Sequence, residues 1–244
     1  MYFFANWKAS VNGSRAVALA QGYARLTASA QGFETALFPS AIDFHAVREV
    51  CKGTGILLGA QSVGFANMAA QTGELSPRAA KAAGARYVLV GHSERRHLFG
   101  ESDEVVARRF ASAFQGALTP VLCIGETASQ RQTNQANQVV QRQLSSALNG
   151  VVSKKFLVAY EPVWAIGAGT AASEAEVKKM HTNIRAALIE IIGEKGKLIP
   201  ILYGGSVHAK NISALLKTPE VAGVLIGTAS ASLSSARALI RSLN

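Results

Sequence analysis

Short apolar runs alternate with longer amphipathic stretches along the chain. The short runs are rich in β-branched and aromatic residues and predict strands at Tyr2–Ala5, Glu34–Phe38, Ile56–Gly59, Tyr87–Gly91, Thr119–Ile124, Phe156–Tyr160, Pro200–Tyr203 and Gly223–Gly227. Apolar residues at helical spacing predict helices between them, clearest at Ser14–Ala28, Ser102–Ala117, Glu174–Ile192 and Ser232–Leu243. Strict alternation of strand and helix predicts a parallel sheet covered by helices.

The number of strand–helix units points to a closed sheet. Eight units in 244 residues fit an α/β protein of the (β/α)₈ barrel type. An open, doubly wound sheet is the alternative. Because no linker or break in composition divides the sequence, we expect residues 1–244 to form one domain.

Each predicted strand ends in residues that suit chemistry. These ends carry Asn6 with Lys8, Gln61, His92, Glu126, Glu161, residues 204–206 and residues 227–228. In a (β/α)₈ barrel the C-terminal ends of all strands form one face, which holds the active site. We therefore expect a site assembled from several strand ends, where a purely structural face would carry ordinary turn residues.

Glu161 is the candidate base. It follows the strand Phe156–Tyr160 and precedes Pro162–Ala172, a loop of small residues and glycines that resembles a lid. Shielding from water strengthens a carboxylate as a base. A salt bridge at the barrel rim is the competing interpretation for an isolated glutamate.

His92 and Lys8 are the candidate electrophilic groups. His92 lies where the chain passes from a strand into a helix or turn, and a helix N-terminus disfavours a charged imidazolium. A neutral His92 could donate a hydrogen bond to a carbonyl oxygen, whereas a lone histidine is more often structural. Lys8 and Asn6 are two residues apart and can face the same side of the barrel mouth. Lys8 would supply positive charge there, and Asn6 an amide donor; solvation alone is the alternative for the lysine.

Two glycine-rich loops follow the last two strands, at residues 203–207 and 225–230. Backbone N–H groups freed by glycine at such loops form phosphate-binding nests. One Gly-Gly pair would indicate only a turn, but two such loops at adjacent strand ends favour a phosphate site.

These blocks together resemble the triosephosphate isomerase family. The matching segments are Asn-Trp-Lys at 6–8, Gly-His-Ser-Glu-Arg-Arg at 91–96, Tyr-Glu-Pro-Val-Trp-Ala-Ile-Gly at 160–167 and the two glycine-rich loops. They occur in the family's order and span essentially the whole chain. The resemblance implies a TIM barrel that interconverts dihydroxyacetone phosphate and D-glyceraldehyde 3-phosphate in glycolysis and gluconeogenesis, with no cofactor and no metal.

The resemblance also implies residue roles. Glu161 would move a proton between the two carbons, neutral His92 would polarise the carbonyl, and Lys8 would stabilise negative charge on the enediolate. Asn6 would position the oxygens, Glu94 would support Lys8 or shuttle protons, and Tyr203 would latch the closed lid. The substrate would also be bound by Asn6 and Lys8, and its phosphate would be held by Gly167, Ser206, Gly227 and the amide of Thr228.

Three segments depart from the family pattern. The lid ends Gly-Ala-Gly-Thr-Ala-Ala at 167–172, where the family usually has Gly-Thr-Gly-Lys-Thr-Ala. Thr228 replaces a glycine, and Ser62 replaces an asparagine after the third strand. We expect these changes to alter lid kinetics and phosphate affinity modestly without changing the reaction.

The loop Gln61–Glu74 is the segment from which we predict the oligomeric state. It ends Gln-Thr-Gly-Glu at 71–74, and in the family this loop reaches into a partner subunit. The resemblance therefore implies a homodimer; a long surface loop is the alternative.

Composition narrows the partners and the compartment. A formal net charge of +10 favours anionic ligands. We expect no nucleic-acid partner, because only two Trp and five Tyr occur and no basic run is interleaved with aromatics. No apolar run has the length of a membrane span, and no signal peptide is evident. Cys51 and Cys123 form no disulfide framework, which favours the cytoplasm.

Two further functions compete with this interpretation. A different phosphate-binding barrel isomerase would explain the glycine loops, but not the joint presence of Asn6, Lys8, His92 and Glu161. The second is a barrel that lost its activity and now serves as a binding protein. Such a protein would not need the intact set of Lys8, His92 and Glu161. Cys123 has apolar neighbours and is expected to pack within its strand rather than act as a nucleophile.

Overall fold

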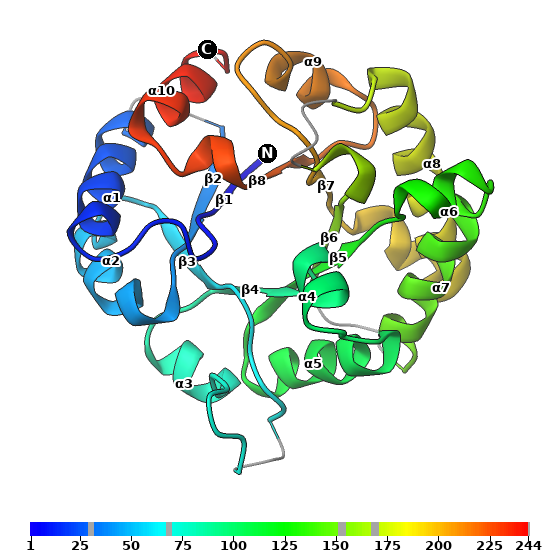
Figure 1. The fold of residues 1–244 in the computed structure, drawn as a ribbon, viewed down its shortest axis with the longest axis horizontal. Coiled ribbons are helices and arrows are strands. Elements are labelled where there is room, and N and C mark those ends of the chain that lie inside the picture. Colours follow the sequence, from blue (N-terminus) through cyan, green and yellow to red (C-terminus); the bar gives the residue numbers. More distant parts are fainter. Residues whose placement is uncertain (29–31, 67–69, 151–154, 167–170, 244) are drawn as a thin grey trace.

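Eight parallel strands close into a barrel in chain order, and helices surround it (Figure 1). The computed structural model describes residues 1–28, 32–66, 70–150, 155–166 and 171–243. The strands are β1 (Tyr2–Asn6), β2 (Glu34–Phe38), β3 (Leu57–Ala60), β4 (Tyr87–Val90), β5 (Thr119–Ile124), β6 (Leu157–Tyr160), β7 (Ile201–Tyr203) and β8 (Gly223–Ile226). Because β1 pairs with both β2 and β8, the closed barrel is confirmed and the open sheet is excluded.

The helices lie between consecutive strands. They are α1 (Ser14–Thr27), α2 (Phe44–Cys51), α3 (Pro77–Ala82), α4 (Ser93–Leu98), α5 (Asp103–Gln115), α6 (Ala128–Gln132), α7 (Ala136–Leu148), α8 (Glu174–Ile192), α9 (Ile212–Lys217) and α10 (Leu233–Arg241). The start of α8 is a capping box, in which the Ser173 hydroxyl accepts from Glu176 N–H and the Glu176 carboxylate accepts from Ser173 N–H. No helix in the described ranges is long and apolar enough to span a bilayer.

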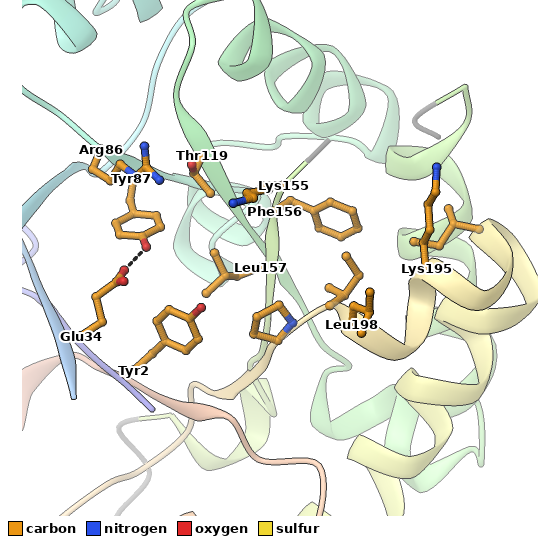
Figure 2. A pocket seen from close by; sticks show the side chains of 13 residues that line it. Tyr2, Glu34, Arg86, Tyr87, Thr119, Lys155, Phe156, Leu157, Lys195 and Leu198 are labelled. Atoms are coloured by element: carbon orange, nitrogen blue, oxygen red, sulfur yellow. Dashed lines mark hydrogen bonds between the residues drawn. The ribbon is translucent and has the colours of Figure 1, made fainter. Parts of the chain in front are cut away.

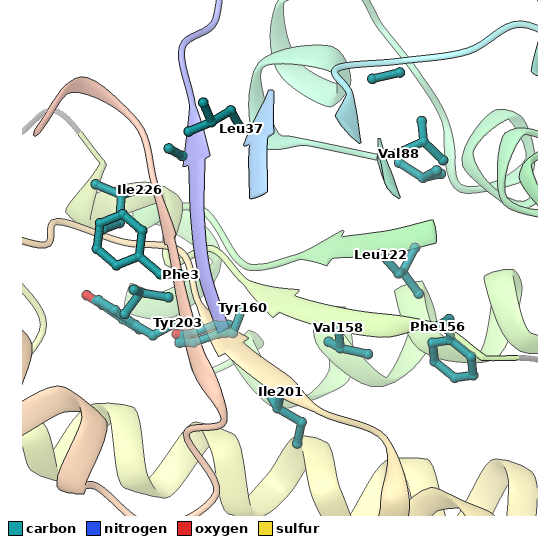
Figure 3. Packing of buried hydrophobic residues seen from close by; sticks show 14 of the residues in the cluster. Phe3, Leu37, Val88, Leu122, Phe156, Val158, Tyr160, Ile201, Tyr203 and Ile226 are labelled. Atoms are coloured by element: carbon teal, nitrogen blue, oxygen red, sulfur yellow. The ribbon is translucent and has the colours of Figure 1, made fainter. Parts of the chain in front are cut away.

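Alternation along each strand divides the core into two layers. Outward residues such as Phe3 and Val88 pack between barrel and helices, as Figure 3 shows for part of this layer. Inward residues such as Phe4 and Leu89 belong to a second cluster inside the barrel. The Phe4 and Tyr87 rings there lie 4.7 Å apart between centroids. The barrel interior is therefore filled by side chains, and both strand faces are buried, which explains the nearly continuous apolar runs in the sequence.

His181 on α8 is a fully buried histidine behind the C-terminal mouth of the barrel. Its ring lies 5.9 Å from that of Tyr160 and 6.5 Å from that of Tyr203, between centroids. Nδ1 lies 3.2 Å from the Glu220 carbonyl oxygen, and Nε2 has no hydrogen-bond partner among the residues that the structure places. Burial lowers the pKa of His181 to about 4, so the imidazole is neutral at physiological pH.

This neutral histidine predicts a loss of stability in mild acid. As the pH falls below 6.5 the unfolded chain binds a proton at His181 before the folded chain does, and the loss is complete near pH 4. Between pH 7 and pH 5 it amounts to about 2 kcal/mol. Urea unfolding of His181→Leu at these two pH values should show a smaller pH-dependent loss than the wild type. The exposed His97 gives the matched control, His97→Leu, which should keep the wild-type slope. Equal slopes for all three proteins would contradict the assignment.

Candidate active site

A pocket of about 490 Å³ opens at the C-terminal ends of the strands. Its lining includes Asn6, Lys8, His92 and Glu161, which leave β1, β4 and β6. The loops after β7 and β8 complete it, with Gly204–His208 on one side and Gly227–Ala229 on the other. The structure thus brings predicted residues from five strand ends to one cavity, whereas Glu94 lines a neighbouring pocket that shares Asn6, Lys8 and His92 with it. Gly167 lies outside the described residues.

Glu161 is fixed at the bottom of this pocket. It directly follows β6, and its side chain is 2% exposed. Its Oε2 accepts a hydrogen bond from Ser93 N–H at 2.7 Å, and Oε1 lies 3.4 Å from His92 Nε2. Ser93 is the first residue of α4, so the carboxylate occupies a helix N-terminus, where backbone N–H groups stabilise negative charge.

Two glycines leave room for Glu161. A Cβ at Gly125 would lie 1.8 Å from the Glu161 carbonyl oxygen, and one at Gly204 would lie 2.9 Å from its Cγ. Gly204 therefore serves the carboxylate, whereas the sequence suggested a phosphate role for this loop as a whole. The Cys123 thiol is a third neighbour; burial first and then the Glu161 carboxylate raise its pKa well above the ordinary value. A thiol held protonated in this way is a packed strand residue.

His92 caps α4 and is 8% exposed. Its Nδ1 accepts a hydrogen bond from Glu94 N–H at 3.3 Å, which requires a lone pair on Nδ1. The neutral ring then carries its proton on Nε2, the nitrogen that faces Glu161. The backbone of α4 thereby selects the tautomer that can donate into the pocket.

Lys8 holds an unusual backbone conformation, with a φ of 51°. A non-glycine residue in this region costs about 1–3 kcal/mol, and such strain gathers at functional sites. Two hydrogen bonds hold it in place: Lys8 N–H donates to Asn6 Oδ1 at 3.0 Å, and Gln61 Nε2 donates to the Lys8 carbonyl at 2.7 Å. Gln61 is a positioning residue that the strand-end pattern marked without indicating its role.

The Lys8 ammonium donates to Glu94 Oε1 at 2.6 Å. The two side chains are 25% and 42% exposed, so this ion pair contributes at most about 1 kcal/mol to stability. The ion pair instead orients the Lys8 side chain, so that its ammonium lies across the mouth of the pocket. Glu94 also lies near His92, with 3.7 Å between Oε2 and Nδ1.

The glycine-rich loops offer backbone donors. Among the residues that the structure places, no hydrogen bond is made by the N–H groups of Gly205, Ser206 and Thr228, all of which line the pocket. The Ser206 hydroxyl donates to the Ala165 carbonyl at 2.6 Å and so ties this loop to the start of the lid segment. Thr228 is exposed and does not have a positive φ, so a side chain is compatible with the backbone at this position.

Comparison with known proteins agrees with this arrangement. The sequence model of "Triosephosphate isomerase" matches residues 1–243. The chain belongs to the triosephosphate isomerase family.

Curated relatives with that name are similar over nearly their full length. The triosephosphate isomerase of Pseudomonas entomophila is 43% identical over 231 residues, which cover 92% of this chain and 91% of the relative. That of Citrifermentans bemidjiense is 38% identical over 97% of this chain and 96% of the relative. That of Roseiflexus sp. is 40% identical over 92% and 90%.

A second polar cluster lies beside the pocket, around the buried carboxylate of Glu126. Glu126 accepts hydrogen bonds from the Tyr160 hydroxyl at 3.0 Å and from Trp164 Nε1 at 2.8 Å. Arg131 lies 3.4 Å from the same carboxylate, stacks 4.3 Å above the Trp164 ring and forms an ion pair with Glu176. Sequence reasoning marked only Glu126 as a strand-end residue. Trp164 belongs to a segment that resembles the family but had no role assigned to it, and Arg131 carried no local signal, because their contact joins segments that are distant in the sequence.

Tyr203, the expected latch, is fully buried. Burial raises the pKa of its phenol to about 12, and the neighbouring Ala172 backbone acts in the opposite direction. Ala172 lies at the end of the segment Pro162–Ala172, so the phenol is in place to contact the lid at its C-terminal end. Among the described residues, no group of three or more His, Cys, Asp or Glu side chains could hold a metal ion.

Proposed function

We propose that this chain interconverts dihydroxyacetone phosphate and D-glyceraldehyde 3-phosphate through an enediolate. The observation that carries the proposal is the convergence of a carboxylate, an imidazole and an ammonium on one pocket with two glycine-rich loops. Membership of the triosephosphate isomerase family supports the same reaction.

Glu161 is the proposed base. Its carboxylate removes a proton from the carbon next to the substrate carbonyl, and the electron pair of that C–H bond forms the enediolate. The same carboxyl group then returns the proton to the neighbouring carbon, so the product is an isomer and no other reactant is consumed. Burial of the side chain at 2% exposure supports this role, because little water competes for the proton.

His92, Lys8 and Asn6 are proposed to act on the oxygens. The His92 Nε2–H donates to the carbonyl as negative charge develops and then moves protons between the two enediolate oxygens. Lys8 contributes a positive charge that the strained backbone and Glu94 hold in place. Such preorganised donors stabilise the developing charge at little reorganisation cost. Asn6 positions the oxygens, and Glu94 supports Lys8.

The phosphate is proposed to bind at the opposite side of the pocket. The N–H groups of Ser206 and Thr228 are the donors, together with Gly227 and with Gly167 of the lid. Closure of Pro162–Ala172 over the ligand would exclude water and so protect the enediolate phosphate from elimination.

Substrate binding requires Glu161 to move. With 3.4 Å between its Oε1 and His92 Nε2, no substrate carbon fits between base and electrophile. The carboxylate must leave Ser93 N–H and swing over the substrate, and only the short side chain has to turn. We connect this movement with lid closure, because Glu161 and the lid are adjacent in the sequence.

The functional unit is proposed to be a homodimer in the cytoplasm. A second pocket, of about 360 Å³, extends from Lys8 and Glu94 past Arg95 to the apolar ring of Phe99. Phe99 and its neighbour Leu98 are 66% and 76% exposed. This surface suits the tip of a partner's third loop, residues 71–74, whose counterpart projects from the barrel in Figure 1. The two buried free cysteines suit a reducing compartment.

Glu161→Gln tests the mechanism. The substitution keeps the side-chain shape and removes the base, so turnover of glyceraldehyde 3-phosphate in a coupled assay should fall by at least about a thousandfold. The affinity for inorganic phosphate, measured as competitive inhibition or by calorimetry, should change less than about threefold. Turnover close to the wild-type rate would mean that another group is the base. Absence of turnover in the folded wild-type chain would overturn the proposed function.

Phe99→Glu tests the assembly. A carboxylate at the centre of the exposed apolar surface should shift the chain from dimer to monomer in sedimentation velocity, and turnover should fall with it. Lys217→Glu introduces the same residue on α9, away from this surface, and should stay dimeric and active. A wild-type chain that sediments as a monomer at micromolar concentration would contradict the dimer.

A further inference from the structure

A third pocket, of about 470 Å³, opens at the end of the barrel opposite the candidate active site (Figure 2). Strand starts build it: Tyr2 begins β1, Glu34 begins β2, Thr119 begins β5 and Leu157 begins β6. A 3-10 helix, Gly193–Leu198, forms another side. This position follows from the parallel barrel, in which all strand N-termini share one face.

The lining of this pocket is apolar and aromatic toward the barrel. Phe156 and Leu157 are each 3% exposed, and Tyr87 is 4% exposed. Tyr87 belongs to the cluster that fills the barrel interior, where its ring meets that of Phe4. Since this cluster occupies the interior between the two mouths, a ligand in the pocket would not contact Lys8, His92 or Glu161.

Basic side chains stand at the rim. Arg86, Lys155 and Lys195 line the pocket and are exposed, and Figure 2 shows Arg86 and Lys155 on the side of Thr119. Within the described ranges, Arg86 and Lys155 form no ion pair with a carboxylate. The single carboxylate of the lining, Glu34, accepts a hydrogen bond from the Tyr87 hydroxyl. Positive charge therefore exceeds negative charge around an apolar wall.

We propose that this pocket binds a small organic anion with a flat apolar body. The volume lies within the range of drug-sized ligand sites, which combine apolar walls with a few placed polar groups. The apolar body would pack on Tyr2, Leu157 and Pro200, and the anionic group would face Arg86 and Lys155. Two cations that pair with no carboxylate of the described residues favour an anion over a neutral ligand of the same shape. The site is independent of the reaction proposed for the opposite face.

Fluorescence titration with 1-anilinonaphthalene-8-sulfonate tests the proposal, because this dye is an aromatic anion of suitable size. We expect saturable binding of one dye per chain to the native protein. In Arg86→Gln/Lys155→Gln the affinity should fall about tenfold, because the anionic group loses both cations. N-phenyl-1-naphthylamine, which lacks the sulfonate, should bind the wild type and this variant within twofold of each other.

Two further variants locate the dye. Lys178→Gln/Lys210→Gln removes the same charge from another surface and should leave dye affinity within twofold of the wild type. Thr228→Asp places a negative charge at the opposite mouth and should also leave it unchanged. A fall in dye affinity in Thr228→Asp would place the dye in the candidate active site and overturn the proposal. Unchanged affinity in Arg86→Gln/Lys155→Gln, or no saturable binding, would overturn it equally.

Discussion

The hydrogen-bond ladder between β5, β6 and β7 sets where the Glu161 carboxylate lies. Glu161 N–H donates to the Ile124 carbonyl, and Gly204 N–H donates to the Tyr160 carbonyl, each at 2.7 Å. These bonds extend the parallel pairing one residue past the end of β6. Because the barrel is closed, neither neighbouring strand can slide without shifting the pairing around the whole ring. The backbone under the base is therefore held by the complete fold, and only its side chain is free to turn.

The sequence predicted the barrel well for a physical reason. Strands that are buried on both faces appear as compact apolar runs, and the eight predicted runs agree with β1–β8 to within one residue at each end. α7 was predicted only as one of the helices between strands and without bounds, since its many glutamines and asparagines obscure a short apolar stripe through Val139, Val140 and Leu144. These residues are buried because α7 packs against the barrel, and the local sequence does not show that packing.

The candidate site likewise contains residues that the sequence could predict and contacts that it could not. Residues that leave strand ends, such as Lys8, His92 and Glu161, could be found from their position and from motif resemblance. The contact of Glu161 with Ser93 N–H and the strained φ of Lys8 could not, because each depends on segments distant in the sequence that meet only in the closed barrel. The same holds for Arg131, whose contacts with Trp164 and Glu176 lie on separate segments of the chain.

The contacts of Arg131 indicate a mechanical role for this residue. It stacks on Trp164, near the start of the proposed lid, and pairs with Glu176 in the first turn of the helix that follows the lid. The guanidinium of Arg131 thus links residues on the two sides of the proposed lid segment. A change at Arg131 would therefore act on both sides of the segment at once.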